Sequence, residues 1–196
     1  MKPFLVGIAG GTGSGKSTAC YALEEKYPGK ISVLHFDDYH KNTNNIPVNF
    51  GLKNWDHPKA INFSKLRADL NKLKSLKSVV IQTKDRRINP EYKYKGRVPI
   101  KIIPKEIILV EGFLCLFDSK VRKLFDLRVF LDLNHETRIK RRNKFKDAIY
   151  LNKILIPMHN KYVEPTKRYA DIIIDVGKLS QNQVLKRLEK ILRQRR

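Results

Sequence analysis

The sequence is poor in cysteine and in acidic residues, and it has no long hydrophobic run. Its 196 residues include two cysteines, Cys20 and Cys115, whose separation fits no metal-ligand motif. No apolar stretch approaches the roughly 20 residues that cross a bilayer, and the first residues have the pattern of a strand instead of a signal peptide. These absences argue against a cysteine metal site and a membrane protein. We expect a soluble, cytoplasmic protein with two buried free thiols.

The scarcity of acidic residues leaves a large positive charge. Only 19 Asp and Glu residues stand against 41 Lys and Arg residues, so the formal net charge is +22. Such a charge attracts polyanions, among them ATP and nucleic acids. The basic residues are concentrated at 84–105, 138–146 and 186–196 and do not form a single arm. A lysine-rich solvated surface therefore explains the charge best, and nucleic-acid binding stays open but is not favoured.

Short apolar runs alternate with helical patterns along the chain. The runs fall at 5–9, 31–36, 78–82, 106–110, 127–133 and 170–175. The clearest helical patterns lie at 15–27, 64–76, 135–146 and 180–193. This alternation predicts an α/β protein in which helices cover both faces of a parallel sheet. No repeat or linker divides the chain, so we expect a single domain over residues 1–196.

Two stretches depart from the alternation. In the polar and basic stretch 84–104, apolar residues alternate around Gly96, which predicts a β-hairpin standing off the main sheet; these residues are Tyr92, Tyr94, Val98, Ile100 and Ile102. The Asn-rich stretch 42–54 predicts a long loop. Loops of this length in compact domains are usually functional or disordered, and its place just after Asp37 favours a functional one.

The most informative motif is Gly-Gly-Thr-Gly-Ser-Gly-Lys-Ser at residues 10–17. It satisfies G-x-x-x-x-G-K-[ST] between a predicted strand and a predicted helix, the context of a phosphate-binding loop. Glycines let the backbone N–H groups approach phosphates, Lys16 would reach the β- and γ-phosphates, and Ser17 would ligate Mg²⁺. The residues expected to bind ATP are Gly11, Thr12, Gly13, Ser14, Gly15, Lys16, Ser17 and Thr18.

Phosphate-binding loops also occur in GTPases, motors and transporters, so carboxylates elsewhere must identify the reaction. Asp37 and Asp38 follow the second predicted strand, at the edge where ligands bind in open α/β sheets. A carboxylate there could accept the proton of an attacking hydroxyl, although a turn or a helix cap would also explain the pair. Glu111 ends another strand and would suit a metal-bound water or the acceptor; an ordinary turn residue is the alternative.

Several motifs in their order along the chain resemble the uridine kinase family, with its phosphoribulokinase-like P-loop kinases. Besides the phosphate-binding loop they are Phe-Asp-Asp-Tyr from residue 36, Asn-Trp-Asp-His-Pro from residue 54, Val-Glu-Gly-Phe-Leu from residue 110 and Tyr-Val-Glu-Pro-Thr-Lys-Arg-Tyr-Ala-Asp-Ile-Ile from residue 162. The resemblance implies a three-layer P-loop NTPase-type fold with five central parallel strands. It also implies transfer of the ATP γ-phosphoryl group, with Mg²⁺, to a primary hydroxyl of a ribosyl compound.

The resemblance also implies roles for individual residues. Asp37 matches the catalytic base, and Asp56 matches the carboxylate that holds the ribose hydroxyls beside an aromatic ring, here Trp55. Arg141 and Arg142 match paired arginines of a basic lid over the phosphates, expected at about 138–156. The candidate acceptor contacts are Asp37, Tyr39, Trp55, Asp56 and Glu111. The candidate metal ligands are Ser17, Asp37 and Glu111.

The acceptor stays open within this resemblance. Uridine kinases carry a Tyr and a His before the hairpin that read the pyrimidine, whereas residues 82–87 here read Gln-Thr-Lys-Asp-Arg-Arg. The lid is also shorter and lacks an Arg-Gly-Arg turn. The first interpretation is a uridine or cytidine kinase, the second a kinase of nicotinamide riboside or another ribosyl or sugar acceptor. An NTP-binding, RNA-associated regulatory protein is the non-enzymatic alternative, but it gives Asp37, Trp55 and Asp56 no task. We also expect a homo-oligomer.

Overall fold

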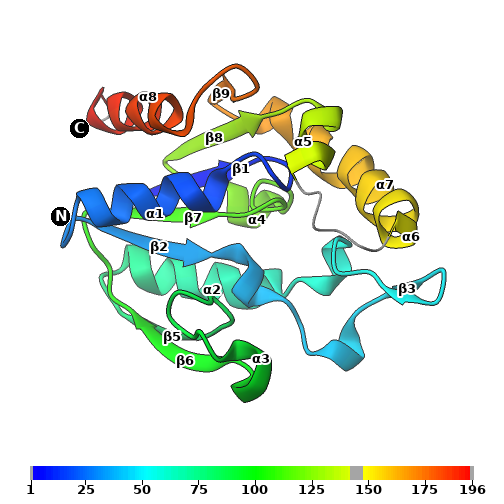
Figure 1. Cartoon of the computed structure of the whole chain (residues 1–196). Helices are drawn as coiled ribbons and strands as arrows, with labels where there is room; N and C mark the ends of the chain where they lie inside the picture. The colour runs from blue at the N-terminus through cyan, green and yellow to red at the C-terminus, as the bar shows by residue number, and fades with distance from the viewer. Residues whose placement is uncertain (1, 142–147, 195–196) are drawn as a thin grey trace.

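Five parallel strands form the central sheet of the protein, whose computed structural model describes residues 2–141 and 148–194. In spatial order they are β2 (Ile31–His35), β7 (Ile107–Glu111), β1 (Phe4–Ala9), β8 (Leu127–Asp132) and β9 (Ile172–Asp175). In the middle, Val6 of β1 pairs with Leu109 of β7 and with Leu127 of β8. The carboxyl ends of the strands therefore meet at one edge, on the right in Figure 1. The predicted five-stranded parallel sheet is confirmed.

Helices cover both faces of this sheet, as predicted (Figure 1). On one face lie α1 (Lys16–Lys26) and α8 (Gln181–Gln194), and on the other α2 (Phe63–Lys74) and α4 (Ser119–Arg122). Because successive strand residues point to opposite faces, Val6 packs in the α1 and α8 core while its neighbour Leu5 packs in the α2 and α4 core. Both faces of the strands are covered by mostly apolar cores, which is why the strands appear in the sequence as continuous hydrophobic runs.

The two cysteines lie in different cores. Cys20 lies on the buried face of α1, and Cys115 is buried in the core on the α2 side of the sheet. Both thiols are free. Burial raises the pKa of both thiols above the ordinary value, so they stay protonated. Among the described residues, no helix is long and apolar enough to cross a membrane.

The hairpin stands off the main sheet, but its strands differ from the predicted ones. β5 (Val79–Thr83) pairs antiparallel with β6 (Val98–Ile102) in a separate two-stranded sheet. The expected first arm is wrong, because Tyr92 and Tyr94 lie in the short helix α3 (Tyr92–Lys95), which Gly96 ends at φ +69°. Ile81 of β5 packs in the α2 core, and this burial selects β5 as the partner of β6.

The Asn-rich stretch contains short structure instead of one long loop. It includes β3 (Val48–Asn49) and β4 (Leu52–Lys53), joined through Phe50 and Gly51, both at positive φ. Before it, Asp37 and Asp38 lie in the 3₁₀ turn η1 (Phe36–Tyr39) that follows β2. Two further 3₁₀ turns are η2 (Thr43–Asn45) and η3 (Pro58–Ala60).

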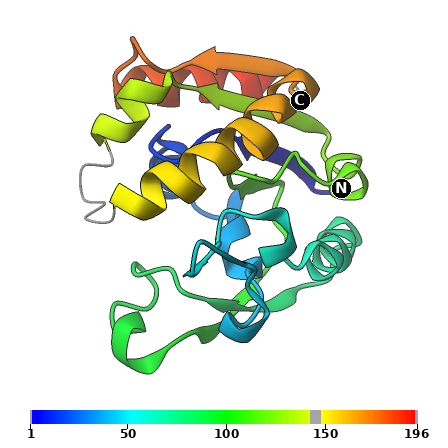
Figure 2. The same ribbon diagram turned by 90° about the vertical axis from the view of Figure 1, so that its right-hand side faces the viewer.

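A second group of helical segments crosses the carboxyl edge of the sheet. α5 (His135–Arg141) follows β8, and after residues 142–147, which lie outside the described part, the chain runs through α6 (Ala148–Tyr150), η4 (Leu151–Leu155), α7 (Ile156–Met158), η5 (His159–Val163) and η6 (Glu164–Tyr169). Figure 2 shows this path passing in front of the strand ends. Segments η4 and η5 are π-helical, a geometry that is frequent at functional sites. The elements that could cover a ligand therefore lie where the sequence places the site residues.

Candidate active site

The phosphate-binding loop joins β1 to α1 and has the backbone shape that its glycines allow. Gly13 and Gly15 have φ angles of +84° and +86°, which side chains rarely adopt. A Cβ atom on Gly11 would lie 2.3 Å from Arg138 Nη1, so glycine is required there for close packing. The loop opens on a cavity of about 790 Å³, which we call the loop cavity; residues 12–19, Asp37, Glu111, Phe113, Arg141 and part of 176–185 line it.

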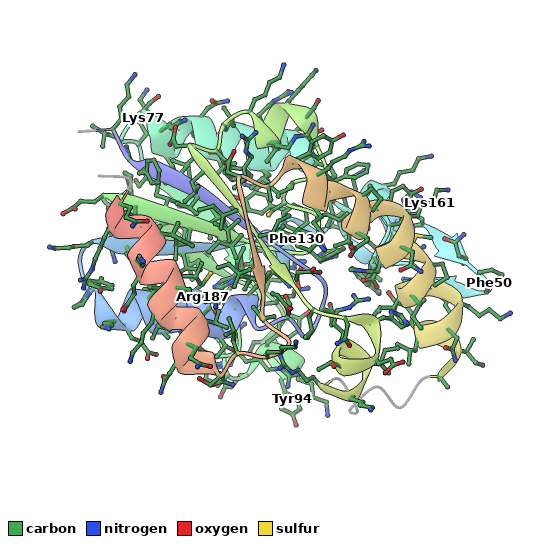
Figure 3. The ribbon with its side chains drawn as sticks, turned by 90° about the horizontal axis from the view of Figure 1, so that it is seen from above. Phe50, Lys77, Tyr94, Phe130, Lys161 and Arg187 are labelled. Atoms are coloured by element: carbon green, nitrogen blue, oxygen red, sulfur yellow. The ribbon has the colours of Figure 1, made fainter. Side chains whose placement is uncertain are left out.

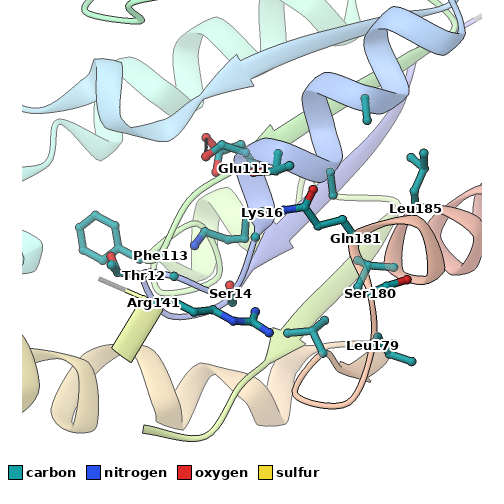
Figure 4. A pocket seen from close by; sticks show the side chains of 18 of the residues that line it. Thr12, Ser14, Lys16, Glu111, Phe113, Arg141, Leu179, Ser180, Gln181 and Leu185 are labelled. Carbon is teal, nitrogen blue, oxygen red and sulfur yellow. Dashed lines mark hydrogen bonds between the residues drawn. The ribbon is translucent and has the colours of Figure 1, made fainter. Parts of the chain in front are cut away.

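Lys16 is folded back on this loop. Its Nζ donates to the Gly11 carbonyl oxygen at 3.0 Å, and only 8 % of the residue is exposed. Burial lowers the pKa of Lys16, while the nearby carboxylates of Glu111 and Asp37 oppose the shift. Figure 4 shows its side chain and that of Arg141 reaching into the same cavity. A buried ammonium whose one hydrogen-bond partner among the described residues is a carbonyl oxygen is well placed to bind an anion such as a phosphate.

A chain of hydrogen bonds leads from the loop to the hairpin. Ser17 Oγ donates to Glu111 Oε1 at 3.1 Å, and His35 Nδ1 donates to the same oxygen at 2.8 Å. His35 Nε2 lies 3.4 Å from Asp85 Oδ2, which also accepts from the Tyr21 hydroxyl. Burial lowers the pKa of His35, but its hydrogen bond to Glu111 and the charges of Glu111 and Asp85 outweigh burial, so the pKa is raised. Glu111 is thus held from two sides.

The residues at this point fit a magnesium ion carried by a nucleotide. Among the residues that the structure describes, no cluster of three or more His, Cys, Asp or Glu could hold a metal unaided. Mg²⁺ bound to ATP needs only one or two protein oxygens, because phosphate oxygens and waters complete its octahedron. The Ser17 hydroxyl and the Glu111 carboxylate lie 3.1 Å apart and supply such oxygens. Asp37, the third candidate ligand, lines the same cavity.

Asp37 lies where the loop cavity meets a second cavity. The second cavity, of about 510 Å³, is called the Trp55 cavity here; Asp37, Thr12 and Phe113 line both. The Asp37 side chain is 51 % exposed, and its Oδ2 lies 4.0 Å from Lys84 Nζ. Burial raises its pKa, but the charges of Lys84, His40 and Lys16 outweigh burial and hold the pKa below the ordinary value. An ionised carboxylate at this position can accept a proton.

Asp38 faces away from both cavities although it is the next residue. Its Oδ1 accepts a hydrogen bond from the Lys84 backbone N–H at 3.0 Å, and the residue is buried. Burial raises the pKa of Asp38, and the hydrogen bonds from Lys84 and Thr83 only partly oppose this. Of the two carboxylates after β2, Asp37 is therefore the one that can reach a ligand.

The Trp55 cavity brings together residues from several distant segments of the chain. The Tyr150 hydroxyl donates to Asp56 Oδ2 at 2.6 Å and accepts from the Trp55 backbone N–H at 3.2 Å. The ring nitrogens of His40 lie 2.8 and 3.0 Å from the carbonyl oxygens of Asp37 and Trp55. His40 and Tyr150 thus fix Trp55 and Asp56, the two expected acceptor contacts, relative to Asp37. No motif near Tyr150 predicts this contact, because its partner Asp56 lies 94 residues away.

Comparison with known proteins identifies the group to which this site belongs. The phosphoribulokinase / uridine kinase family model matches residues 5–184. The chain belongs to this family. It is 36 % identical over 193 residues to a uridine kinase from Anoxybacillus flavithermus, covering 90 % of this chain and 87 % of that protein. It is 37 % identical over 193 residues to a uridine kinase from Clostridium botulinum, covering 90 % and 89 %.

Solved structures agree on the fold. A possible uridine kinase from Bacillus stearothermophilus superposes with a TM-score of 0.64 at 20 % identity, covering 89 % of this chain and 90 % of that chain. Shikimate kinase from Acinetobacter baumannii superposes with a TM-score of 0.54 at 14 % identity, covering 98 % and 94 %. The predicted P-loop kinase fold and the resemblance to the uridine kinase family are confirmed. Family membership makes the protein an ATP-dependent kinase.

One residue expected from the family resemblance does not line the loop cavity or the Trp55 cavity. Tyr39 is 2 % exposed and packs in the α2 core. Its hydroxyl donates to Asp69 Oδ2 of α2 at 3.0 Å. The η1 turn directs Asp37 outward and Tyr39 inward, because a 3₁₀ turn rotates successive side chains around its axis. Tyr39 therefore anchors η1 to α2, and its assignment as an acceptor contact stays a prediction that neither cavity supports.

The basic helix contributes one expected and one unexpected arginine. Arg141 lines the loop cavity, as the family resemblance implies. Arg142 lies outside the described residues. Arg138, three positions before Arg141, is only 4 % exposed, lies against Gly11 and donates from Nη2 to His135 Nδ1 at 3.0 Å. Sequence analysis missed this buried arginine because an arginine in a basic run is usually solvated.

The remaining wall of the loop cavity comes from the end of the chain. Val176, Leu179 and Leu185 supply apolar surface, and Gln181 supplies a polar side chain beside them (Figure 4). The base of a nucleotide, which is flat and mostly apolar with polar edges, would fit against such a wall. The sequence predicted α8 as a packed helix but gave no sign that its first turn reaches the site.

Proposed function

We propose that the protein transfers the γ-phosphoryl group of ATP to the primary 5′-hydroxyl of a nucleoside. The observation that carries this proposal is the position of Asp37, whose carboxylate lines the loop cavity and the Trp55 cavity at once. A terminal phosphate in the first cavity and a hydroxyl in the second would meet at this side chain. Membership in a kinase family supports the same conclusion.

The loop cavity would hold the nucleotide. Backbone N–H groups of residues 11–18 and the amino end of α1 would bind the β- and γ-phosphates. Lys16 would exchange the Gly11 carbonyl for phosphate oxygens. Ser17 and Glu111 would hold Mg²⁺, which when bound neutralises charge on the β- and γ-phosphates. Arg141 would place a further positive charge on the transferring group, as would Arg142 if it has the role that the resemblance implies.

The Trp55 cavity would hold the acceptor. Asp56, fixed by Tyr150, would accept hydrogen bonds from the ribose hydroxyls while the Trp55 ring packs beside the sugar or base. Asp37 would take the proton of the 5′-hydroxyl as that oxygen bonds to the γ-phosphorus. The bond to the bridging oxygen then breaks, and ADP leaves with the electron pair. The products are a nucleoside 5′-phosphate and ADP.

Uridine or cytidine is the first choice of acceptor, because the relatives that match most of the chain are uridine kinases. Nicotinamide riboside or another ribosyl compound is the alternative, since residues 82–87 lack the pyrimidine-reading Tyr and His of the family. A role as an RNA-associated regulator has no specific observation in its favour. The homo-oligomeric state stays a prediction.

An acceptor-dependent ADP-release assay tests the proposal. Purified protein with ATP and Mg²⁺ is supplied in turn with uridine, cytidine, nicotinamide riboside and ribose, and product phosphate is located by ³¹P NMR. We expect ADP release that requires a nucleoside and yields a 5′-phosphate. The matched Asp37→Asn protein should bind ATP but release little ADP. ADP release that is the same without any acceptor would contradict the proposal.

A further inference from the structure

A third cavity continues from the Trp55 cavity towards the hairpin. It has a volume of about 550 Å³, and Trp55 and Lys84 line both it and the Trp55 cavity. Its other walls include Lys41, Tyr92 and Arg97, together with the polar residues 42–44. None of the described residues that line it is acidic. We call it the basic cavity, because three cationic side chains share it.

The η1 turn holds the Arg97 side chain and the Lys84 backbone at the basic cavity. Arg97 Nη1 donates to the Asp38 carbonyl oxygen at 2.6 Å and to the Gln82 carbonyl oxygen at 3.3 Å. The Lys84 backbone N–H donates to Asp38 Oδ1 at 3.0 Å. Asp38 thus fixes the backbone before the cavity, and its carboxylate is not part of the cavity lining. Positive charge is built into this position and does not simply follow from a lysine-rich surface.

The Arg97 guanidinium has donors left for a ligand. Only Nη1 is engaged within the described chain, and both its partners are neutral carbonyl oxygens. Lys84 Nζ approaches an acidic oxygen only at 4.0 Å, the distance to Asp37 Oδ2. A guanidinium donates to a carboxylate through two parallel N–H groups, an arrangement that neutral groups satisfy poorly. The ring of Tyr92 offers a flat surface on the same wall.

We propose that the acceptor of this kinase carries a carboxylate at the end away from the hydroxyl that is phosphorylated. Arg97 and Lys41 bind this carboxylate in the basic cavity, Lys84 adds positive charge between them and Asp37, and Trp55 contacts the ring that bears the carboxylate. The inference rests on the proposed kinase function and narrows its substrate class from nucleosides in general to anionic ones. It also gives a role to Lys84, which lies within residues 82–87, and to Arg97, whose Nη1 donates to the Gln82 carbonyl oxygen.

Two pairs of acceptors that differ in a single charged group test the proposal. Nicotinic acid riboside is compared with nicotinamide riboside, and 5-carboxyuridine with uridine, by kcat/KM at saturating ATP. We expect the carboxylate member of at least one pair to be preferred about tenfold or more, the scale of one charge-assisted hydrogen bond. The preference should persist at 0.5 M KCl, where the long-range attraction of a +22 protein is screened. A preference that vanishes there, or neutral acceptors that are equal or better in both pairs, would overturn the proposal.

Substitutions identify which residues cause the preference for a carboxylate acceptor. Lys41→Gln removes an exposed charge that makes no contact with Asp37, and it should raise KM about fivefold or more for the carboxylate acceptor only. Arg97→Gln should act in the same direction and more strongly. Lys77→Gln is the matched control, because Lys77 precedes β5 and lines none of the three cavities; Figure 3 shows it well apart from Tyr94 of α3. It should change neither KM.

The outcomes separate this inference from the proposed function. If neutral nucleosides are phosphorylated well and no carboxylate is preferred, the kinase function stands and the anionic acceptor is wrong. If Lys41→Gln and Arg97→Gln lower kcat/KM equally for neutral and anionic acceptors, the basic cavity is structural and the inference is also wrong. If no acceptor in either pair is phosphorylated, both proposals fail.

Discussion

The nucleotide side and the acceptor side of the site are built in different ways. On the nucleotide side, backbone N–H groups and Lys16 of one continuous segment, residues 11–18, would make most of the phosphate contacts, and Glu111 and Arg141 add single side chains to the loop cavity. The Trp55 cavity takes its chemistry from side chains that come from η1, from β4 and the residues after it, from the hairpin and from α6. A site that binds through backbone atoms tolerates most side-chain substitutions, whereas a site that binds through side chains changes with each substitution. The acceptor side is therefore where members of one kinase family can differ.

Asp37 belongs to both sides, so its substitution should have the largest effect. Asp37→Asn keeps the shape but removes the proton acceptor, and phosphoryl transfer should fall about 10²- to 10⁴-fold. The affinity for ATP should stay within a few-fold of the unaltered protein. Single-turnover kinetics with radiolabelled ATP measures the first quantity and equilibrium binding the second.

Asp38→Asn is the matched control for that prediction. An asparagine Oδ1 can still accept the hydrogen bond from the Lys84 N–H, and Asp38 lines neither the loop cavity nor the Trp55 cavity. We expect kcat to fall less than tenfold. Equal losses in the two variants would mean that the acidic turn has one shared structural task, and the distinction between Asp37 and Asp38 would be lost.

Lys16→Ala should impair phosphoryl transfer from ATP without affecting the binding of the acceptor. Removing a buried ammonium that would bind the β- and γ-phosphates should lower kcat about 10²- to 10³-fold, the scale for a lost electrostatic stabiliser. Acceptor binding should be unchanged. Lys26→Ala on the same helix is the control, because its Nζ is paired with Glu189 away from the loop. Steady-state kinetics with both substrates varied would reveal a role on the acceptor side if the acceptor KM rose as well.

The nucleotide side was predictable because its chemistry is local. The motif at residues 10–17 fixes the loop, the start of α1 and the position of Lys16 without reference to the rest of the chain. The same holds for α8, which was predicted at 180–193 and is found at Gln181–Gln194, since its apolar stripe is a local pattern. Asp37 and Glu111 were also found, because strand ends of a parallel sheet share one edge.

The acceptor side was less predictable because its partners meet only after folding. Tyr150 meets Asp56 across 94 residues, and no pattern near either residue indicates the contact. His35 contacts Glu111 because they are directly paired between β2 and β7, which requires the strand order to be known. The burial of Tyr39 was not predicted, because the sequence does not say which side of a 3₁₀ turn faces the core. Long-range packing decides each of these cases.

Tyr150→Phe should weaken the acceptor side without touching the nucleotide side. The change removes the hydroxyl that holds both Asp56 and the Trp55 backbone, so KM for the acceptor should rise about tenfold, the scale of one hydrogen bond to a charged group. KM for ATP should not change. Tyr94→Phe is the control, because Tyr94 is 84 % exposed on α3. A rise of both KM values would show that Tyr150 supports the whole edge of the sheet.

The smallest effect is expected from His159, which packs against the phosphate-binding loop. Burial, followed by the charges of Arg138, His135 and Lys16, lowers the pKa of His159 to about 3. Glu164 accepts a hydrogen bond from its Nε2 at 3.3 Å, but that carboxylate is 47 % exposed and solvent screens its charge. The folded protein thus keeps the imidazole neutral, whereas the unfolded chain binds a proton below a pH of about 6.5.

Because the unfolded chain binds the extra proton, the free energy of unfolding should fall as the pH drops below about 6.5, by about 1.4 kcal/mol per pH unit from this residue. At pH 7 the imidazole is mostly neutral in both the folded and the unfolded state, so this loss of stability is small there. His159→Gln should lower the pH dependence by that amount, which urea denaturation at pH 7, 6 and 5 would measure. Glu164→Gln, the matched control, should leave the slope nearly unchanged. If instead Glu164→Gln alters the slope as much as His159→Gln, the imidazole is controlled by its carboxylate partner, and the loop does not depend on a buried neutral ring.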